Sequence, residues 1–349
     1  MLQQVIDRFK RQRTNAFLQR TYNRRYAFVG MGQHSLTNLY PVLHYLGVPL
    51  KYICVTNAEK AALISRKYPG TEGTTDLDKV LADPEVGGVF VAASPKAHFT
   101  LAMKVLEAGK PLFIEKPPCL TLSEQQTLAQ TGGTAMVGVQ KRYAPAVQIL
   151  KKQLHKDKHN FPTLGGERGE AYELHYATGA YPEGDALTDL YIHPLDLAVH
   201  LFGPAELLAA RLIGANSYVL MLEHRGGAVG TLHLSTAHSW TGASERLDVT
   251  TRRGTYRLRQ LETLTFEAKQ PTLLGIPMEK VRPAHRSIEF LYGRNNFTPT
   301  PTNNQLVSQG FYDELLCFTE LCEGRRATNL STPESLLPTF RLMERMSDI

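Results

Sequence analysis

Ionisable side chains of types that can take part in proton transfer stand at Lys116 and, at helical spacing, at Asp189, His193, Asp196 and His200 in this 349-residue sequence. Asp189 and His193 stand four residues apart in the segment DLYIH, so a helix would place them on one face. Histidine suits proton transfer because its unperturbed pKa lies near neutrality. The structural alternatives are a surface ion pair between Glu115 and Lys116 and a helix-capping position for His193.

The position of Lys116 follows from the strand expected before it. Residues 112–114 (LFI) form an apolar run bounded by breakers, which predicts a parallel strand covered on both faces. The two prolines after Lys116 end that strand, because proline cannot donate a hydrogen bond to the ladder. Open α/β sheets bind ligands at the carboxyl ends of their strands, so we expect Glu115 and Lys116 to contact the cofactor there.

A glycine-rich turn near the N-terminus predicts a dinucleotide site. Residues 26–30 (YAFVG) read as a first strand that runs directly into Gly30-Met31-Gly32-Gln33-His34-Ser35. The first glycine allows the tight turn, and the second lets the backbone approach a pyrophosphate. The third position must be small, and a serine stands there in place of the usual Gly or Ala. The helix expected at residues 36–46 would direct its free N–H groups at the phosphates.

The end of the second predicted strand, residues 50–55, bears on the choice of cofactor. No carboxylate stands at this strand tip, where one would bind the ribose 2′-hydroxyl of NAD. Thr56, Asn57 and Lys60 are instead suited to a 2′-phosphate, so we favour NADP over NAD. The alternative is that Glu59 reaches back to the ribose, which would favour NAD.

Strands and helices alternate with short links from residue 26 to residue 143, which predicts a doubly wound parallel sheet. A strand at 86–93 ends at Ser94 and Pro95, which we expect to contact the cofactor. We expect His98 to brace the start of the next helix beneath the cofactor. Tyr143 lies on the crossover from the cofactor part to the substrate part and is a candidate substrate contact.

The segments GMGQHS, ASPKAHF, EAGKPLFIEKPP and VGVQKRYAP, in this order and spacing, resemble the Gfo/Idh/MocA oxidoreductase family. That family includes glucose–fructose oxidoreductase and inositol dehydrogenase, and the likeness covers roughly residues 26–349. It implies an α/β fold: a Rossmann domain followed by an α+β domain with a large, mostly antiparallel sheet. The resemblance further implies a substrate site on one face of that sheet and a homodimer or homotetramer formed through it.

The DLYIH segment matches the family's D-x-x-x-H element, so the resemblance implies that Lys116, Asp189 and His193 are catalytic and contact the substrate. In this interpretation His193 exchanges the hydroxyl proton and Asp189 holds the imidazole tautomer. Lys116 hydrogen-bonds the substrate oxygen and lowers the histidine pKa. Other residues receive supporting assignments: Asp196 as a structural partner, His200 as a helix-face residue, and Tyr172, His175 and Trp240 as pocket lining.

The second half of the chain is consistent with an α+β domain. Segments of alternating polarity, with turn signals between several of them, predict strands from residue 166 to residue 259. Residues 270–305 predict a long loop with one strand near 287–291, and closing helices follow at 310–323 and after 331. The expected division is an N-terminal arm at 1–25, a cofactor domain at 26–143, a substrate and oligomerisation domain at 144–305, and C-terminal helices at 306–349.

Composition indicates a globular protein, with 42% hydrophobic and 21% charged residues. We expect no membrane segment, because no apolar run approaches the roughly 18 residues required. We also expect no secretory signal, because residues 1–25 are polar and basic and contain no apolar core segment. The four cysteines lack metal-binding spacing, so we expect reduced thiols, a cytoplasmic location and no metal site.

The net charge of +6 belongs to the N-terminal arm. Residues 1–25 hold seven bases and one acid, whereas the remaining chain has 32 of each. Leu2, Val5, Ile6 and Phe9 predict a short amphipathic helix. We favour its packing on its own domain or on a sister subunit over contact with nucleic acid or another anionic surface.

The sequence therefore predicts an NAD(P)-dependent oxidoreductase with a small-molecule substrate. The reaction is hydride transfer between nicotinamide and a secondary alcohol or ketone of a sugar, inositol or nucleotide sugar. One alternative is a non-catalytic NAD(P)-binding sensor of the same fold, which the basic arm favours. Another is a reductase of a non-sugar substrate such as an imine.

Overall fold

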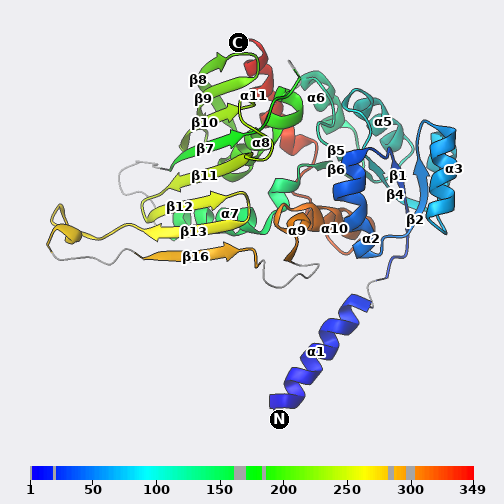
Figure 1. Ribbon diagram of the computed structural model, residues 1–349, viewed down its shortest axis with the longest axis horizontal. Coiled ribbons are helices and arrows are strands. Elements are labelled where there is room, and N and C mark those ends of the chain that lie inside the picture. The colour runs from blue at the N-terminus through cyan, green and yellow to red at the C-terminus, as the bar shows by residue number, and fades with distance from the viewer. Residues whose placement is uncertain (1, 19–20, 161–169, 183–185, 282–286, 296–302) are drawn as a thin grey trace.

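The computed structural model describes residues 2–18, 21–160, 170–182, 186–281, 287–295 and 303–349. Two sheets lie beside each other in this structure, each with helices packed against it (Figure 1). One has six strands in the order β3-β2-β1-β4-β5-β6, and the other has eight in the order β16-β13-β12-β11-β7-β10-β9-β8. The predicted fold class, a Rossmann sheet plus a large and mostly antiparallel sheet, is confirmed.

The six-stranded sheet is parallel throughout, because every neighbouring pair of strands runs in the same direction. Its central strands are apolar runs buried on both faces, as the sequence predicted. The strands are β1 (Arg25–Val29), β2 (Leu50–Cys54), β3 (Glu72–Thr74), β4 (Val86–Val91), β5 (Leu112–Glu115) and β6 (Ala135–Gly138). The connecting helices are α2 (Tyr40–Leu46), α3 (Ala58–Lys67), α4 (Leu77–Ala82), α5 (Pro95–Glu107) and α6 (Leu122–Gln130).

Local sequence signals explain where several of these helices begin. Asn57 and Asp76 cap α3 and α4, each accepting a hydrogen bond from the backbone N–H three residues on. Thr121 and Glu124 form a capping box at the start of α6. Pro95 occupies the first turn of α5, where its missing N–H costs nothing.

The eight-stranded sheet is antiparallel except where β7 and β10 pair in parallel. Three helices contribute to the core on one face of this sheet: α7 (Pro145–Asn160), α8 (Ile192–Phe202) and α11 (Leu337–Ser347). Two others lie nearer the Rossmann sheet, α9 (Gln305–Ser308) and α10 (Phe311–Cys322) (Figure 1). The strands are β7 (Ala171–Ala177), β8 (Ala205–Ile213), β9 (Ser217–His224), β10 (Val229–Ser235), β11 (Ser244–Thr250), β12 (Gly254–Arg259), β13 (Thr263–Ala268) and β16 (Ile288–Gly293).

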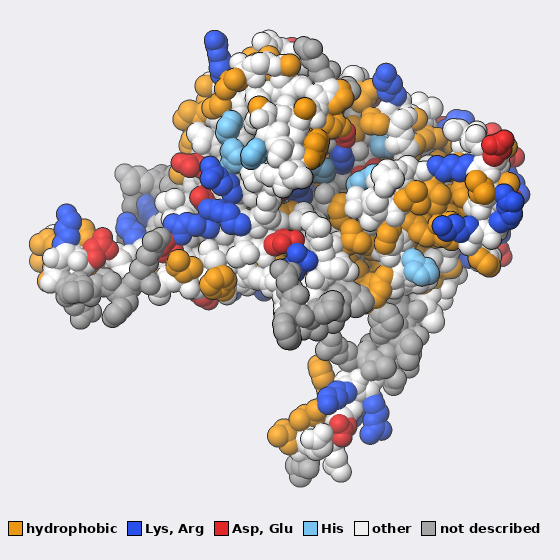
Figure 2. All heavy atoms as spheres, viewed as in Figure 1, with side chains coloured by type: hydrophobic (Ala, Val, Ile, Leu, Met, Phe, Trp, Pro, Cys, Tyr) orange, Lys and Arg blue, Asp and Glu red, His pale blue; other side chains and the backbone are white. Residues whose placement is uncertain are grey.

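The segment after β13 differs from the long loop that the sequence predicted. Two short strands, β14 (Thr272–Leu273) and β15 (Ile276–Pro277), pair as a hairpin that projects from the sheet (Figures 1 and 2). Its turn contains Leu274 at φ 50° and Gly275 at φ 81°. A leucine rarely adopts positive φ, so no ordinary turn signal marked this hairpin in the sequence. The single strand expected near 287–291 is confirmed as β16.

The N-terminal arm is a helix, α1 (Leu2–Leu18), which extends away from both sheets (Figure 1). The predicted helix is confirmed, but packing of its apolar face on its own domain is wrong for this structure. Leu2, Val5 and Phe9 are all more than half exposed. Among the described residues, no helix is both long and apolar enough to cross a membrane.

A buried ion pair joins the crossover after β6 to α8. Arg142 and Asp196 are both about 2% exposed in their side chains, with two N–O contacts of 2.8 and 2.5 Å. The guanidinium also donates to Leu330 and Ser335, and Thr339 donates to the carboxylate. Because these groups come from three separate parts of the chain, the pair fixes the C-terminal segment against α8 and the crossover.

We expect Asp196→Ala to lower the free energy of unfolding by about 3–5 kcal/mol, because it leaves the Arg142 charge buried without its partner. Urea unfolding followed by circular dichroism measures the change. Asp248→Ala is the matched control, since the Asp248–Arg259 pair is about one-third exposed and such pairs contribute roughly 0–1 kcal/mol. Equal losses in the two variants would contradict this account.

Candidate functional site

The glycine turn after β1 has the shape that a pyrophosphate requires. Gly30 has φ 91°, and a Cβ there would lie 2.3 Å from the carbonyl oxygen of Ala92, so this position excludes every other residue. A Cβ on Gly32 would meet no atom within 4 Å, so the backbone there faces open space. Ser35 is buried and begins a π-helical turn (Ser35–Leu39) that continues as α2. The turn therefore fits a dinucleotide phosphate at a helix start.

Met31, Gln33 and His34 complete the turn. Met31 is buried, whereas Gln33 and His34 are exposed. The His34 Nε2 lies 3.4 Å from the Glu115 carboxylate, so the turn contacts the end of β5. The predicted cofactor residues on these two segments are thus brought together.

The residues expected at the adenosine ribose cluster at the start of α3. Asn57 uses its side-chain oxygen to cap the helix, accepting from the Lys60 N–H at 2.8 Å. The Lys60 ammonium donates to the carbonyl of Met31 in the glycine turn. Thr56 is exposed beside them. A cation therefore lies between the tip of β2 and the phosphate-binding turn.

Ser94 and His98 link the end of β4 to the loop that carries Lys116. Ser94 is the N-cap residue of α5. His98 is buried, with its Nε2 accepting from the Ala93 N–H at 3.2 Å and its Nδ1 lying 2.7 Å from the Pro117 carbonyl oxygen. Burial lowers the pKa of His98, which favours the neutral ring with the proton on Nδ1. His98 therefore ties two loops together, in agreement with its expected bracing position.

Lys116 reaches across from the end of β5 to the second half of the chain. Its Nζ lies 2.5 Å from Oδ1 of Asp189 and 2.9 Å from the Asp189 carbonyl oxygen. The other carboxylate oxygen of Asp189 accepts from the Tyr181 hydroxyl. Among the described residues these contacts use two of the three ammonium donors, which leaves one for another acceptor.

The expected contact between Asp189 and His193 is wrong in this structure. Asp189 lies in a π-helical turn (Leu187–Tyr191), and His193 lies in α8 directly after it. The π-helix is wider than the α-helix, so a spacing of four residues across this junction does not stack the two side chains. The His193 Nδ1 is buried without a hydrogen-bond partner among the described residues.

The environment of His193 favours its neutral form. Burial lowers the pKa of His193 well below 6.5, and the positive charges of Lys116, Lys141 and a protonated His34 lower it further. A neutral imidazole with a free ring nitrogen is a proton acceptor near neutral pH. Lys116 is therefore paired with Asp189 and is close enough for its charge to act on His193, whose Nδ1 has no hydrogen-bond partner among the described residues.

The sequence did not single out Lys141, Glu245 or Tyr181 as site residues. Lys141 is nearly buried, with its Nζ 2.6 Å from Glu245 and 4.7 Å from the centre of the Tyr176 ring. The segment VGVQKRYAP contains Lys141, but its pattern does not show which side chain faces the site. Tyr181 stands eight residues before Asp189, a spacing that carries no recognised signal.

The structure does not place Tyr143 at the site. The ring is 3% exposed, and its hydroxyl lies 2.9 Å from Ser331 Oγ and accepts from the Leu330 N–H. The 3-10 turn at Gln140–Tyr143 directs the Tyr143 ring into the core. The expected contact between Tyr143 and the substrate is therefore wrong in this structure.

Two of the other pocket candidates also lie elsewhere. Tyr172 is buried and stacks on Phe202 at 4.3 Å, and its hydroxyl bonds to His224. His175 contacts His233 on the opposite face of the sheet. Trp240, by contrast, lies beside Tyr181, with ring centres 6.4 Å apart.

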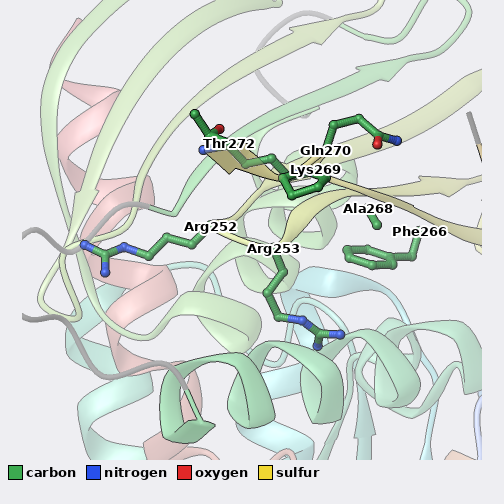
Figure 3. Close-up of a pocket in the computed structure, with 8 residues that line it drawn as sticks. Arg252, Arg253, Phe266, Ala268, Lys269, Gln270 and Thr272 are labelled. Carbon is green, nitrogen blue, oxygen red and sulfur yellow. The ribbon is translucent and has the colours of Figure 1, made fainter. Parts of the chain in front are cut away.

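A separate surface pocket lies at the β11–β12 turn and the end of β13, and none of the predicted site residues line it (Figure 3). Arg252, Arg253 and Lys269 contribute to its wall, and Arg253 pairs with Asp157 at 2.5 Å. Within the described residues, no three His, Cys, Asp or Glu side chains form a metal-binding cluster.

The chain is similar to known dehydrogenases in sequence. It is 28% identical over 168 residues to scyllo-inositol 2-dehydrogenase (NAD(+)) of Bacillus subtilis, covering 44% of this chain and 46% of that protein. It is 31% identical over 155 residues to D-xylose dehydrogenase of Paenarthrobacter nicotinovorans, covering 41% of this chain and 39% of that protein. The matched part thus spans less than half the length of these relatives.

The fold is also that of a solved dehydrogenase. The structure of levoglucosan dehydrogenase in complex with NADH and L-sorbose superposes with a TM-score of 0.75 at 17% identity, covering 94% of this chain and 96% of that one. Residues 24–143 match the model of an oxidoreductase family with an NAD-binding Rossmann fold, GFO_IDH_MocA. Residues 24–143 are therefore similar in sequence to the NAD-binding Rossmann domain of that oxidoreductase family.

Proposed function

We propose that this protein is an NAD(P)-dependent oxidoreductase that transfers a hydride between nicotinamide and a secondary alcohol or ketone of a sugar, inositol or nucleotide sugar. The observation that supports this most directly is a neutral His193, whose Nδ1 has no hydrogen-bond partner among the described residues, close enough to Lys116 for the lysine charge to lower its pKa. The glycine turn after β1 fits a dinucleotide, which supports binding of NAD(P). The match of residues 24–143 to an oxidoreductase family model supports the reaction class.

The proposed mechanism assigns a separate task to each side chain. A bound nicotinamide supplies or accepts the hydride. The Lys116 ammonium donates its remaining hydrogen bond to the substrate oxygen and stabilises the charge that develops there. His193 accepts the hydroxyl proton during oxidation and returns it during reduction. Asp189 holds Lys116 in place and takes no proton.

The paired charges support a neutral substrate. Lys116 contacts Asp189 and Lys141 contacts Glu245, so each lysine already has a carboxylate partner. A sugar or inositol presents hydroxyl groups that these residues bind without displacing either pair.

We propose that a second copy of the chain covers the outer face of the eight-stranded sheet, giving a homodimer or homotetramer. Both edges of that face are apolar: Leu208, Val219 and Met221 at one, and Ile288 and Phe290 at the other, all at least 40% exposed. A two-fold axis along the strands would place unlike edges against each other and cover both.

We also propose that the chain divides into its parts at residues 26, 144 and 306, with support from the two sheets described above.

We propose a cytoplasmic location as well. The four cysteine thiols are buried and free, which supports a reducing environment.

We expect His193→Asn and Lys116→Met each to reduce turnover of a sugar substrate by about 10²–10⁴, the range for loss of acid–base or charge-stabilising groups. In His193→Asn the affinity for NADPH, followed by its fluorescence, should remain within a few-fold of that of the unchanged protein. His200→Asn, on the same helix beside Lys151, is the control and should retain turnover. A His193→Asn variant with unchanged kcat would exclude the histidine as the proton acceptor.

The pH dependence of alcohol oxidation should report the low pKa of His193. The neutral ring is the active form, so its protonation reduces kcat/KM only when the pH falls through its pKa, well below 6.5. Lys141→Met removes a positive charge that lowers this pKa, so the decrease of kcat/KM at acid pH should begin at a higher pH. A decrease at the same pH or at a lower pH would argue against this electrostatic coupling.

We favour NADP over NAD, because the Lys60 ammonium lies between the tip of β2 and the glycine turn. Lys60→Ala should weaken NADPH binding at least about tenfold, the loss of one charge-assisted hydrogen bond, and leave NADH binding nearly unchanged. Glu59→Gln is the complementary variant. Tighter binding of NADH than NADPH, with a loss of NADH binding in Glu59→Gln, would assign the ribose contact to Glu59 and favour NAD.

A further inference from the structure

Trp240 is the single tryptophan of the chain, and its side chain is 56% exposed. It lies in the connection between β10 and β11, where its ring is beside that of Tyr181. A single exposed aromatic residue is not unusual by itself. What distinguishes Trp240 is the way in which its neighbours hold it.

The backbone beside the indole is adapted to it. A Cβ on Gly179 would lie 2.4 Å from Cδ1 of Trp240 and 2.7 Å from its Nε1, so only a glycine allows the indole to lie against this backbone. The N–H of His238 donates to the Thr178 carbonyl at 3.0 Å, which joins the loop before Trp240 to the segment before Gly179. The indole is thus held at one side while more than half of its surface faces solvent.

Trp240 is also close to the proposed reaction centre. The centre of its ring lies 6.4 Å from that of Tyr181, and the Tyr181 hydroxyl donates to Asp189. Asp189 in turn holds Lys116. The four side chains therefore form a continuous row from an exposed aromatic surface to the ammonium that would contact the substrate oxygen.

We propose that Trp240, together with Tyr181, forms a stacking platform for a neutral carbohydrate ring of the substrate. This inference rests on the proposed function and specifies the substrate class. One face of a sugar ring presents C–H groups that pack on an aromatic face, while its edge presents hydroxyl groups. The row of residues offers this combination, an aromatic surface followed by Tyr181, Asp189 and Lys116.

The charges favour a neutral ring over an acidic one. Both site lysines are paired with carboxylates, so their charges are already balanced and attract an acidic sugar little more than a neutral one. The platform instead selects by ring shape and by apolar surface. Neutral sugars and inositols should therefore bind better than uronic acids or sugar phosphates of the same ring size.

The binding experiment uses the intrinsic fluorescence of Trp240, which is the whole tryptophan signal of this protein. The full chain carrying His193→Asn is saturated with NADP and titrated with neutral monosaccharides, disaccharides and myo-inositol, and with uridine. We expect a saturable change in emission with at least one neutral sugar or with inositol. A response to uridine alone would overturn the carbohydrate platform and indicate stacking of a base.

The kinetic experiment compares variants with His193 intact. Trp240→Ala should raise KM for the neutral substrate at least tenfold, with kcat within about threefold and NADPH binding unchanged. Trp240→Phe should recover most of the affinity. Gly179→Ala should reproduce the Trp240→Ala effect because its Cβ displaces the indole, whereas Gly293→Ala, whose Cβ would meet nothing within 4 Å, should have no effect.

The two experiments separate failure of the platform from failure of the proposed function. Turnover of sugars with an unchanged KM in Trp240→Ala and no fluorescence response would overturn the platform and keep the oxidoreductase. A saturable fluorescence response to sugars without turnover of any of them in the unaltered protein would support the platform and overturn the oxidoreductase. An unchanged KM in Gly179→Ala beside a raised KM in Trp240→Ala would overturn the assigned role of Gly179.

Discussion

The contact between Lys116 and Asp189 is the interaction on which the candidate site depends. It joins the carboxyl end of β5 to the π-helical turn before α8, two segments 73 residues apart in sequence. Because the ammonium bonds to both the side chain and the backbone of Asp189, it fixes the turn as well as the carboxylate. His193 follows on α8, so its position relative to β5 is set by the same contact.

A second ion pair supports the first from within the core. Asp196 lies three residues after His193 on α8 and binds Arg142, which directly follows Lys141. The neighbouring residues Lys141 and Arg142 therefore anchor different segments, the lysine at Glu245 on β11 and the arginine on α8. Buried pairs of this kind are costly to break because each partner would be left as an unpaired charge. The site geometry and the stability of the fold thus depend on adjacent contacts.

Much of the fold was predictable because its signals are local. Buried parallel strands are apolar runs, helix starts contain capping residues, and the glycine turn needs small residues at defined positions. The side-chain directions at the site were less predictable. The segment DLYIH indicates helix, but its residues do not reveal that the first turn is a π-helix, and so the pairing of Asp189 with His193 was wrong. Tyr143 and Lys141 stand two residues apart, and only the 3-10 turn that contains them decides which one is buried in the core and which contacts Glu245.

The pairing of Lys116 and Lys141 with carboxylates also affects which substrates the candidate site favours. A site with an unpaired cation would bind anionic substrates strongly and would discriminate poorly among them. Here Asp189 and Glu245 already balance the charges of the two lysines, so an anionic ligand gains little net attraction for the solvation that it loses in a partly buried site. A hydroxyl group meets no such penalty, because it can accept the remaining Lys116 donor while the ion pair persists. The ion pairs that hold the site together therefore also disfavour acidic substrates, and the exposed indole beside them adds an apolar surface that a neutral ring can cover.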